Sequence, residues 1–421
     1  MTIDVDLNPM QVVLEHVISD PQVDISQGSS QRQLSIEVSA LAEPEDRQLP
    51  LNLCLILDRS GSMKGTSLDT VKDAAKKLIG GLKPEDRLSI VAFNHQAETI
   101  VPCQQVTDLA DIFAQIDRLQ ASGGTAIDAG IKLGITESLA GKQDRVSHAF
   151  ILTDGENEHG DNERCLKLAG FATESNITLN TLGFGEHWNQ NILEKIADTA
   201  AGTLAYIAEA AQAVSEFGRI FNRMQSVGLT NAYLQLELKP KVRLAELKPI
   251  AQVAPDTIEL TVEDDGKLQI VRLGDLMKDL SRVILVNTYI GQLAAGEQSI
   301  ATLQIRYDDP AKGLTNLLTP PVSVNVNIIS NHQPAVDSNV QQHTLALAKY
   351  RQTQLAEQKL QQGDRSGAAT LLQTAAKTAL QMGDTSAATV LQANATILQG
   401  GEDLSEADKK QTRIVSKTIL Q

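Results

Sequence analysis

The stretch from Leu51 to Met63, LNLCLILDRSGSM, constrains the fold of this chain more than any other. Its first half is an almost unbroken apolar run, which is typical of a strand buried on both faces of a parallel sheet. The run ends at Asp58, and Ser60 and Ser62 follow at alternate positions. In open α/β sheets, ligands bind just beyond the carboxyl ends of the strands. We therefore expect a carboxylate and two hydroxyls at such an edge, a set of hard oxygens that suits a small divalent cation.

Two later segments carry further oxygen-bearing side chains. The loop Ser122-Gly123-Gly124-Thr125 precedes a helical pattern, and it offers the hydroxyl of Thr125 where two glycines allow close backbone approach. The run His148–Thr153 predicts another buried strand, and it is followed by Asp154, in the position equivalent to Asp58. Because the carboxyl ends of parallel strands meet at one edge of a sheet, we expect both carboxylates there.

These three fragments, in this order, resemble the metal-ion-dependent adhesion site of the von Willebrand factor A family, over about residues 48–228. The resemblance implies a doubly wound, Rossmann-like and mainly parallel sheet that binds Mg²⁺, or Ca²⁺ or Mn²⁺ in its place. The ligands that it implies are Asp58, Ser60, Ser62, Thr125 and Asp154. Two carboxylates would neutralise a divalent ion, whereas the hydroxyls add no charge. The resemblance also implies that an Asp or Glu side chain of a partner protein completes the coordination.

The overall composition argues against several classes of protein. The 421 residues are 42% hydrophobic and 21% charged, as in an ordinary globular chain, and the net charge of −15 disfavours nucleic acids and anionic membrane surfaces as partners. Three cysteines without metal-like spacing indicate neither a disulfide framework nor a zinc site. Residues 1–11 lack the pattern of a signal peptide, and no apolar run approaches about 18 residues. We therefore expect a cytoplasmic protein without a membrane span.

The order of elements predicts an α/β domain inserted into a β-sandwich. Within residues 48–228 strands and helices alternate, which indicates a mainly parallel sheet with helices on both faces. Residues 1–47 hold two strands that cannot form a core alone, and residues 229–332 are again rich in strands, with Asp-rich turns between them. Together the two flanking segments would complete one sandwich. This layout is similar to that of inter-alpha-trypsin-inhibitor heavy-chain-like proteins.

The last part of the chain, residues 340–421, predicts a helical bundle. Its composition shifts to Ala, Gln and Leu, and the segment Leu360–Ser366 returns as Leu380–Ser386. Each copy places a glycine at a helix end and an Asp or Ser at the next helix start. We expect antiparallel helices over about 342–361, 366–381 and 386–398, with a fourth after Ser405.

We interpret the chain as a non-enzymatic, metal-dependent module for protein interaction, and two other functions stay open. One is service to an AAA+ ATPase in cofactor insertion or complex assembly; that ATPase would be a separate chain, because Gly61–Gly65 lacks the spacing of a P-loop. The other is a Mg²⁺-dependent phosphohydrolase with Asp58 as nucleophile. Ser60 disfavours it, since enzymes of the haloacid dehalogenase type carry a second carboxylate there. The identity of the partner and the oligomeric state stay open.

Simpler interpretations exist for several of these residues. Ser60 and Ser62 can cap the following helix, and Asp154-Gly155 can form an ordinary turn. For His187-Trp188, packing or loop stabilisation stands beside a role at the rim of the site. We assign no role to Asn94-His95. The residues expected in a solvated loop are Glu156, Asn157 and His159.

Overall fold

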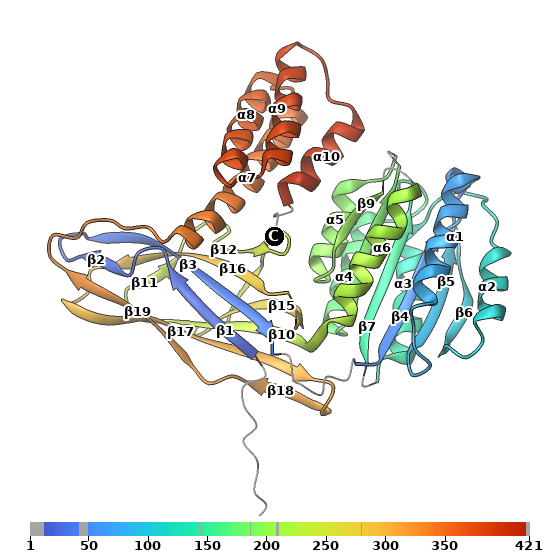
Figure 1. The fold of residues 1–421 in the computed structure, drawn as a ribbon, viewed down its shortest axis with the longest axis horizontal. Coiled ribbons are helices and arrows are strands. Elements are labelled where there is room, and N and C mark those ends of the chain that lie inside the picture. Colours follow the sequence, from blue (N-terminus) through green and yellow to red (C-terminus); the bar gives the residue numbers. More distant parts are fainter. Residues whose placement is uncertain are drawn as a thin grey trace, which may run out of the picture.

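The structure, a computed structural model, describes residues 12–417 except 42–48, 144, 186, 208, 209 and 279. Residues 1–11, on which we predict the absence of a leader, and the tail residues 418–421 lie outside the described residues. Three parts are present (Figure 1): an α/β domain, a β-sandwich beside it, and a helical tail above the junction of the two. This arrangement is the fold class that the sequence predicts.

A six-stranded sheet forms the centre of the α/β domain, in the order β6-β5-β4-β7-β8-β9. Its strands are β4 (Leu51–Asp58), β5 (Arg87–Phe93), β6 (Ala97–Gln105), β7 (Val146–Thr153), β8 (Thr178–Phe184) and β9 (Leu204–Ile207). All neighbouring pairs are parallel except the hairpin of β5 and β6. The carboxyl ends of β4, β7 and β8 therefore meet at one edge of the sheet.

Strand β6 is an element that the sequence analysis does not predict. Its sequence, AETIVPCQQ, is largely polar and contains Pro102, a residue that sheets tolerate on edge strands. The strand forms the outer edge of the sheet, and its pairing with β5 is irregular between Leu88 and Ile90. Its position beside β5, rather than its own pattern, makes this segment a strand.

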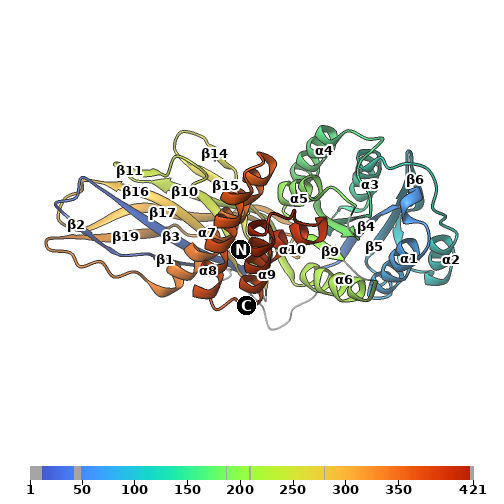
Figure 2. The ribbon, with the colours of Figure 1, turned by 90° about the horizontal axis from the view of Figure 1, so that it is seen from above.

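Helices cover both faces of this sheet (Figure 2). The helices on one face are α1 (Thr66–Ile79), α2 (Leu109–Asp117) and α6 (Ala210–Gln225), and those on the other are α3 (Ile127–Gly141), α4 (Asn162–Glu174) and α5 (Gln190–Thr199). Strand β4 contributes to both cores, with Leu53, Leu55 and Leu57 in the first and Cys54 and Ile56 in the second. Burial on both sides explains why the run is apolar at successive positions.

Two mainly antiparallel sheets form the sandwich. One has the order β1-β3-β16-β12-β13 with β11 beside β16, and the other has the order β14-β15-β10-β17-β19-β2 with β18 beside β17. Their strands are β1 (Val12–Ile18), β2 (Gln22–Asp24), β3 (Ser29–Ala40), β10 (Val227–Leu238), β11 (Val242–Leu244), β12 (Ile250–Ala254), β13 (Ile258–Glu259), β14 (Val262–Asp264), β15 (Gln269–Met277), β16 (Arg282–Gly291), β17 (Gly296–Asp309), β18 (Leu314–Leu318) and β19 (Val322–Ile329). Strand β3 pairs with β16, Ile36 opposite Ile284, so the amino-terminal strands complete the sandwich. The short β2 pairs in parallel with β19 and adds a third strand to the two that the sequence predicts in residues 1–47.

The helices of the tail, within the described residues, are α7 (Ser338–Gln361), α8 (Arg365–Gln381), α9 (Thr385–Gln399) and α10 (Glu406–Lys417). The carboxylates of Asp364 and Asp384 accept hydrogen bonds from backbone N–H groups three residues on, at 2.8 Å and 2.9 Å, and so cap α8 and α9. Gly363 and Gly383 precede them with φ of +79° and +80°, a conformation that favours glycine. Alanines dominate the interior of the bundle. The predicted helical bundle is thus confirmed.

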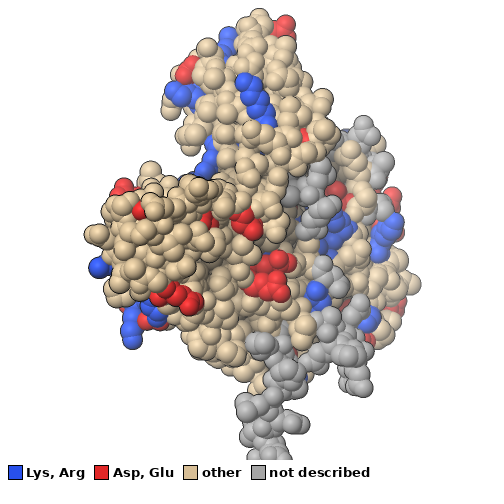
Figure 3. All heavy atoms as spheres, turned by 60° about the vertical axis from the view of Figure 1, so that its left-hand side comes forward, with Lys and Arg blue, Asp and Glu red and all other residues tan. Residues whose placement is uncertain are grey.

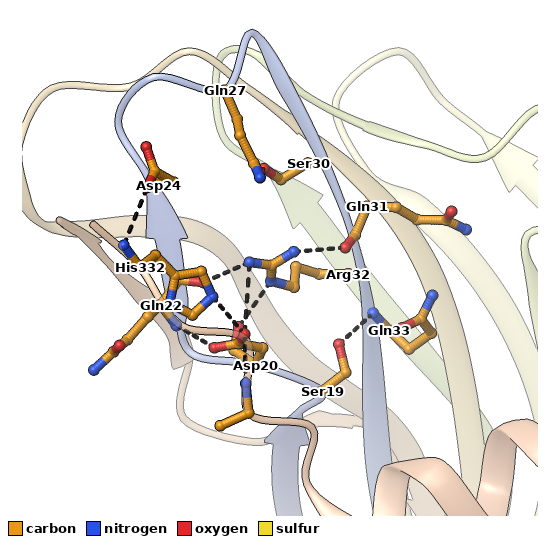
Figure 4. Close-up of polar contacts among 11 residues, drawn as sticks. Ser19, Asp20, Gln22, Asp24, Gln27, Ser30, Gln31, Arg32, Gln33 and His332 are labelled. Carbon is orange, nitrogen blue, oxygen red and sulfur yellow. Dashed lines mark hydrogen bonds and ion pairs between the residues drawn. The ribbon is translucent and has the colours of Figure 1, made fainter. Parts of the chain in front are cut away.

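The tail is anchored to the sandwich where the chain leaves β19. The carboxylate of Asp20 accepts a hydrogen bond from His332 Nε2 at 2.7 Å and lies 3.9 Å from the guanidinium of Arg32 (Figure 4). Farther along α7, Arg351 forms an ion pair with Glu259 at 2.8 Å. These contacts fix the base of α7 on the sandwich.

The described residues contain no helix that is both long and apolar enough to cross a membrane. On the face drawn in Figure 3, lysine and arginine side chains lie apart from one another, whereas acidic side chains gather in small groups. The positive charge is therefore dispersed on that face.

Candidate functional site

Asp58 is the last residue of β4, and its side chain is fully buried at the carboxyl edge of the sheet. Its Oδ1 accepts a hydrogen bond from the backbone N–H of Ser60 at 2.7 Å, and its Oδ2 accepts one from the hydroxyl of Thr153 at 2.5 Å. Burial raises the pKa of Asp58 to about 6, although both hydrogen bonds oppose that rise. Groups at two adjacent strand ends thus hold the carboxylate in a fixed orientation.

The two serines connect the loop after Asp58 with the end of β7. The hydroxyls of Ser60 and Ser62 lie 3.0 Å apart, and Ser62 donates a hydrogen bond to Asp154 Oδ1 at 2.7 Å. Neither the short helical turn Gly61–Met63 nor α1 has a side-chain cap at its start. The alternative in which these serines cap the following helix is therefore wrong.

Thr125 precedes α3 and reaches the same edge. A Cβ atom placed on Gly155 would lie 3.4 Å from Thr125 Oγ1 and 3.5 Å from Ser62 Oγ, so both hydroxyls lie beside this glycine. The backbone N–H of Gly61 donates to the carbonyl of Gly123 at 2.8 Å and joins the two loops. Five side chains therefore lie together at this edge and form what we call the candidate site: Asp58, Ser60, Ser62, Thr125 and Asp154.

The two carboxylates of the candidate site form no ion pair with a lysine or arginine of the described residues. Neither Asp58 nor Asp154 forms an ion pair there, whereas the neighbouring Arg59 pairs with Glu98 at 3.0 Å. Burial raises the pKa of Asp154, against the hydrogen bond from the serine and the nearby imidazole of His187. Because buried carboxylates without countercharge are unfavourable, the site favours a bound cation or protonation. Carboxylate and hydroxyl oxygens in this combination fit a hard divalent cation such as Mg²⁺.

Thr153 is a residue of this edge that the sequence analysis missed. It ends β7, is fully buried, and supplies the hydroxyl that holds Asp58. Its backbone pairs in register with Gly183 of β8. The signal in the sequence is a hydroxyl residue at the end of an apolar run, immediately before Asp154. This signal is weak, because the β-branched shape of threonine alone favours it in a strand.

Side chains in the loops around the candidate site make more contacts than the predicted solvated loop would. A Cβ atom on Gly123 would lie 2.5 Å from His95 Nδ1, and one on Gly124 would overlap the ring of His159, so both imidazoles, although exposed, pack on this glycine pair. Asn157 is half-buried rather than solvated, because its Oδ1 accepts a hydrogen bond from the backbone N–H at the start of α3 at 2.7 Å.

Trp188 is buried beside the same edge, in the loop after β8. Its indole N–H donates to the carbonyl of Gly185 at 2.8 Å, and its ring lies 5.8 Å from that of Tyr206. A Cβ atom on Gly183 would overlap the indole, so only glycine allows the strand and the Trp188 ring to lie this close together. The side chain thus packs within the domain, while its neighbour His187 is exposed.

Comparison with known proteins identifies two family matches. The von Willebrand factor type A domain matches residues 52–219, and the Sll0103-like, C-terminal alpha-helical domain matches residues 338–421. The uncharacterized protein sll0103 of Synechocystis sp. is 57% identical over 412 residues, which cover 98% of each chain. Inter-alpha-trypsin inhibitor heavy chain H1 of Mesocricetus auratus is 29% identical over 197 residues, 44% of this chain and 21% of that one.

A solved structure shares the complete arrangement. The von Willebrand factor type A protein from Catenulispora acidiphila has a TM-score of 0.81 with 97% of each chain covered, at 18% identity. The likeness therefore includes the sandwich and the helical tail as well as the α/β domain. At this identity it shows the fold alone.

Proposed function

Because the chain belongs to the same family as the Synechocystis protein sll0103, and carries a von Willebrand factor type A domain with an Sll0103-like helical domain, we propose that it is a non-enzymatic, divalent-metal-dependent module for protein interaction. Domains of the von Willebrand factor A family typically mediate protein interactions. In our proposal the candidate site holds Mg²⁺, or Ca²⁺ or Mn²⁺ in its place, and an Asp or Glu side chain of the partner completes the coordination.

The observation that carries this proposal is the buried carboxylate of Asp58, which has hydroxyl and N–H donors but no cationic side chain beside it among the described residues. A divalent cation compensates such a charge without a large side chain. The described residues gather no set of three or more His, Cys, Asp or Glu side chains for a metal. Serine and threonine hydroxyls, together with water, therefore supply the remaining ligands.

Hydroxyl groups orient the two carboxylates of the candidate site in this proposal. A bound metal supplies a Lewis-acidic position for an incoming carboxylate. Thr153 orients Asp58, and Ser62 orients Asp154, through the hydrogen bonds described above. Since the residues alone carry only negative charge, they repel an acidic partner until the metal is bound. Binding of the partner is then strictly metal-dependent.

Two further observations agree with the proposal. The first concerns the absence of a catalytic pair from the described part of the chain, and the second concerns the compartment. Within the described residues, no histidine forms a hydrogen bond with Ser60 or Ser62, as an activated serine nucleophile requires. The three cysteines, Cys54, Cys103 and Cys165, are free thiols, which agrees with a cytoplasmic location.

Calorimetric titration with Mg²⁺ tests the proposal directly. Asp58→Asn keeps the size of the side chain and one of its two acceptor oxygens but removes the charge, so we expect the heat of binding to vanish. Asp265→Asn is the matched control, because Asp265 is exposed in a turn and bonded only to local backbone. Equal binding by both variants would contradict the proposed site.

A further inference from the structure

Helix α10 presents one basic face to the α/β domain. Lys410, Arg413 and Lys417 follow one another at spacings of three and four residues, which place them on the same side of the helix. Figures 1 and 2 both show α10 beside α5. All three side chains are largely buried although each is charged. Buried cations on one helix face require a matching surface.

The matching surface on α5 is acidic. Lys417 Nζ lies 2.9 Å from Glu194 Oε1 and 2.7 Å from Asp198 Oδ1, and Arg413 also pairs with Glu194. Glu194 is only 2% exposed, and burial alone would raise its pKa, but the two cations outweigh burial and lower it. The backbone carbonyl of Lys417 also accepts a hydrogen bond from Thr257 of the sandwich at 2.9 Å. Helix α10 therefore joins all three parts of the molecule.

A continuous chain of packed groups runs from α10 to the candidate site. The ammonium of Lys410 lies 4.3 Å from the centre of the Trp188 ring, a cation–π contact. The Trp188 ring in turn covers Gly183. Gly183 pairs with Thr153, whose hydroxyl holds the carboxylate of Asp58. These contacts connect Trp188 with the residue that orients Asp58.

The same loop reaches the second carboxylate. His187 precedes Trp188, and its imidazole is close enough to lower the pKa of the Asp154 carboxyl, against the rise that burial causes. His187 and Trp188 thus connect this part of the chain with both carboxylates of the candidate site.

We propose that docking of α10 on Trp188 and α5 is coupled to metal occupancy of the candidate site, so that the helical tail regulates the interaction module. This inference rests on the proposed function, because it concerns the regulation of the same site. In the structure α10 is docked, and Ser62 lies 3.0 Å from the hydroxyl of Ser60 and 2.7 Å from Asp154 Oδ1, so we propose that docking favours the metal. Coupling is reciprocal: undocking weakens metal binding by the factor by which metal strengthens docking.

Two substitutions on the docked face of α10 test this coupling in the full chain. Lys410→Met and Lys417→Met keep an unbranched side chain but remove the charge that faces the α/β domain. We expect the Kd for Mg²⁺ in calorimetric titration to rise by about 5-fold or more, the lower range for coupled sites. Lys409→Met is the matched control, because Lys409 lies on the exposed side of the same helix, paired with Glu406. We expect its Kd to equal that of the wild type.

A second measurement needs no substitution in α10. Hydrogen exchange over residues 406–417 should slow when Mg²⁺ is added to the wild type and should not respond in Asp58→Asn. Fluorescence offers a parallel signal, since Trp188 is the one tryptophan of the sequence and touches Lys410.

The outcomes separate the two proposals. If the wild type does not bind Mg²⁺, the proposed function fails and the coupling fails with it. If the wild type binds Mg²⁺ and Asp58→Asn does not, but exchange in α10 is unchanged and both α10 variants bind as the wild type does, only the coupling is overturned. Tighter Mg²⁺ binding by the α10 variants would also overturn it, because docking would then oppose the metal.

Discussion

Lys349 of α7 and Asp384 at the start of α9 form a buried ion pair, with the ammonium nitrogen 3.0 Å from the carboxylate. Lys349 is fully buried, and Asp384 also caps α9 by accepting a backbone N–H. Burial would raise the pKa of Asp384, but the cap and the ammonium group outweigh burial and lower it. One carboxylate thus serves both a helix start and a cation in the core of the tail.

Replacing that carboxylate by an amide should strongly destabilise the tail. Asp384→Asn keeps a capping side chain but removes the negative charge 3.0 Å from the buried ammonium group of Lys349, so we expect the free energy of unfolding to fall by about 3 kcal/mol. Asp364→Asn makes the same change at the start of α8, where the partner, Lys359, is 45% exposed, and little change is expected. Denaturant unfolding of both variants measures the difference. If both variants lose the same free energy of unfolding, the buried ion pair contributes no more to stability than the exposed one.

Acid should weaken the junction between the α/β domain and the sandwich. Asp275 Oδ2 lies 3.1 Å from His148 Nε2 and accepts a hydrogen bond from Thr178 at 3.0 Å. Burial would raise the pKa of Asp275, but the contacts with His148 and Thr178 help to hold this pKa below its usual value. A depressed carboxyl pKa stabilises the fold above the unfolded value of about 4, and this stabilisation is lost as the pH falls through the folded pKa.

The corresponding measurement is the free energy of unfolding as a function of pH, from about 7 downward. Asp275→Asn should be less stable than the wild type at neutral pH, and its stability should fall less steeply in acid. An identical slope in both proteins would show that Asp275 does not titrate with unfolding.

Two glycine-to-alanine substitutions should change stability in opposite directions. At Gly183 a Cβ atom overlaps the Trp188 ring, so we expect Gly183→Ala to lower the free energy of unfolding by about 1–3 kcal/mol. At Gly170, inside α4, a Cβ atom has no neighbour within 4 Å, and alanine should stabilise by about 0.5–1 kcal/mol. Denaturant unfolding measures both values. If Gly183→Ala leaves the free energy of unfolding unchanged, the indole can move aside without cost.

Removing one hydroxyl should weaken metal binding without unfolding the sheet. Thr153→Val keeps the shape of the side chain but removes the hydrogen bond to Asp58, and we expect Mg²⁺ affinity to fall about 10-fold, as is usual when a group that orients a ligand is lost. Thr181→Val is the control, because Thr181 is equally buried in β8 but donates to the carbonyl of Leu193. Calorimetric titration compares the two, and equal affinities would exclude an orienting role for Thr153.

Local sequence patterns predict the elements that carry their own signal. The apolar run ending at Asp58 predicts β4 because both of its faces are buried, and the Gly-Asp repeats predict the starts of α8 and α9 because capping depends on neighbouring residues. The strand β6 lacks such a signal, since an edge strand with Pro102 is defined by the strand beside it.

Relationships between distant residues lie beyond such patterns. The pairing of Lys410 with Trp188, and of His148 with Asp275, depends on how three parts pack together. A buried lysine at position 410 is indistinguishable in sequence from the exposed Lys409 beside it. The hydroxyl of Thr153 likewise becomes meaningful only when β4 and β7 are adjacent.

The strand β3 ends at Ala40, and a Cβ atom on Gly228 in β10 would lie 2.9 Å from the Cβ of Ala40. The chain therefore leaves the sandwich and returns to it at almost the same point. During synthesis, β1 and β3 leave the ribosome before β16, and they cannot pair with it until the whole intervening domain has been made. The six strands of that domain are consecutive in the chain, so its sheet has all of its strands before the sandwich receives β16.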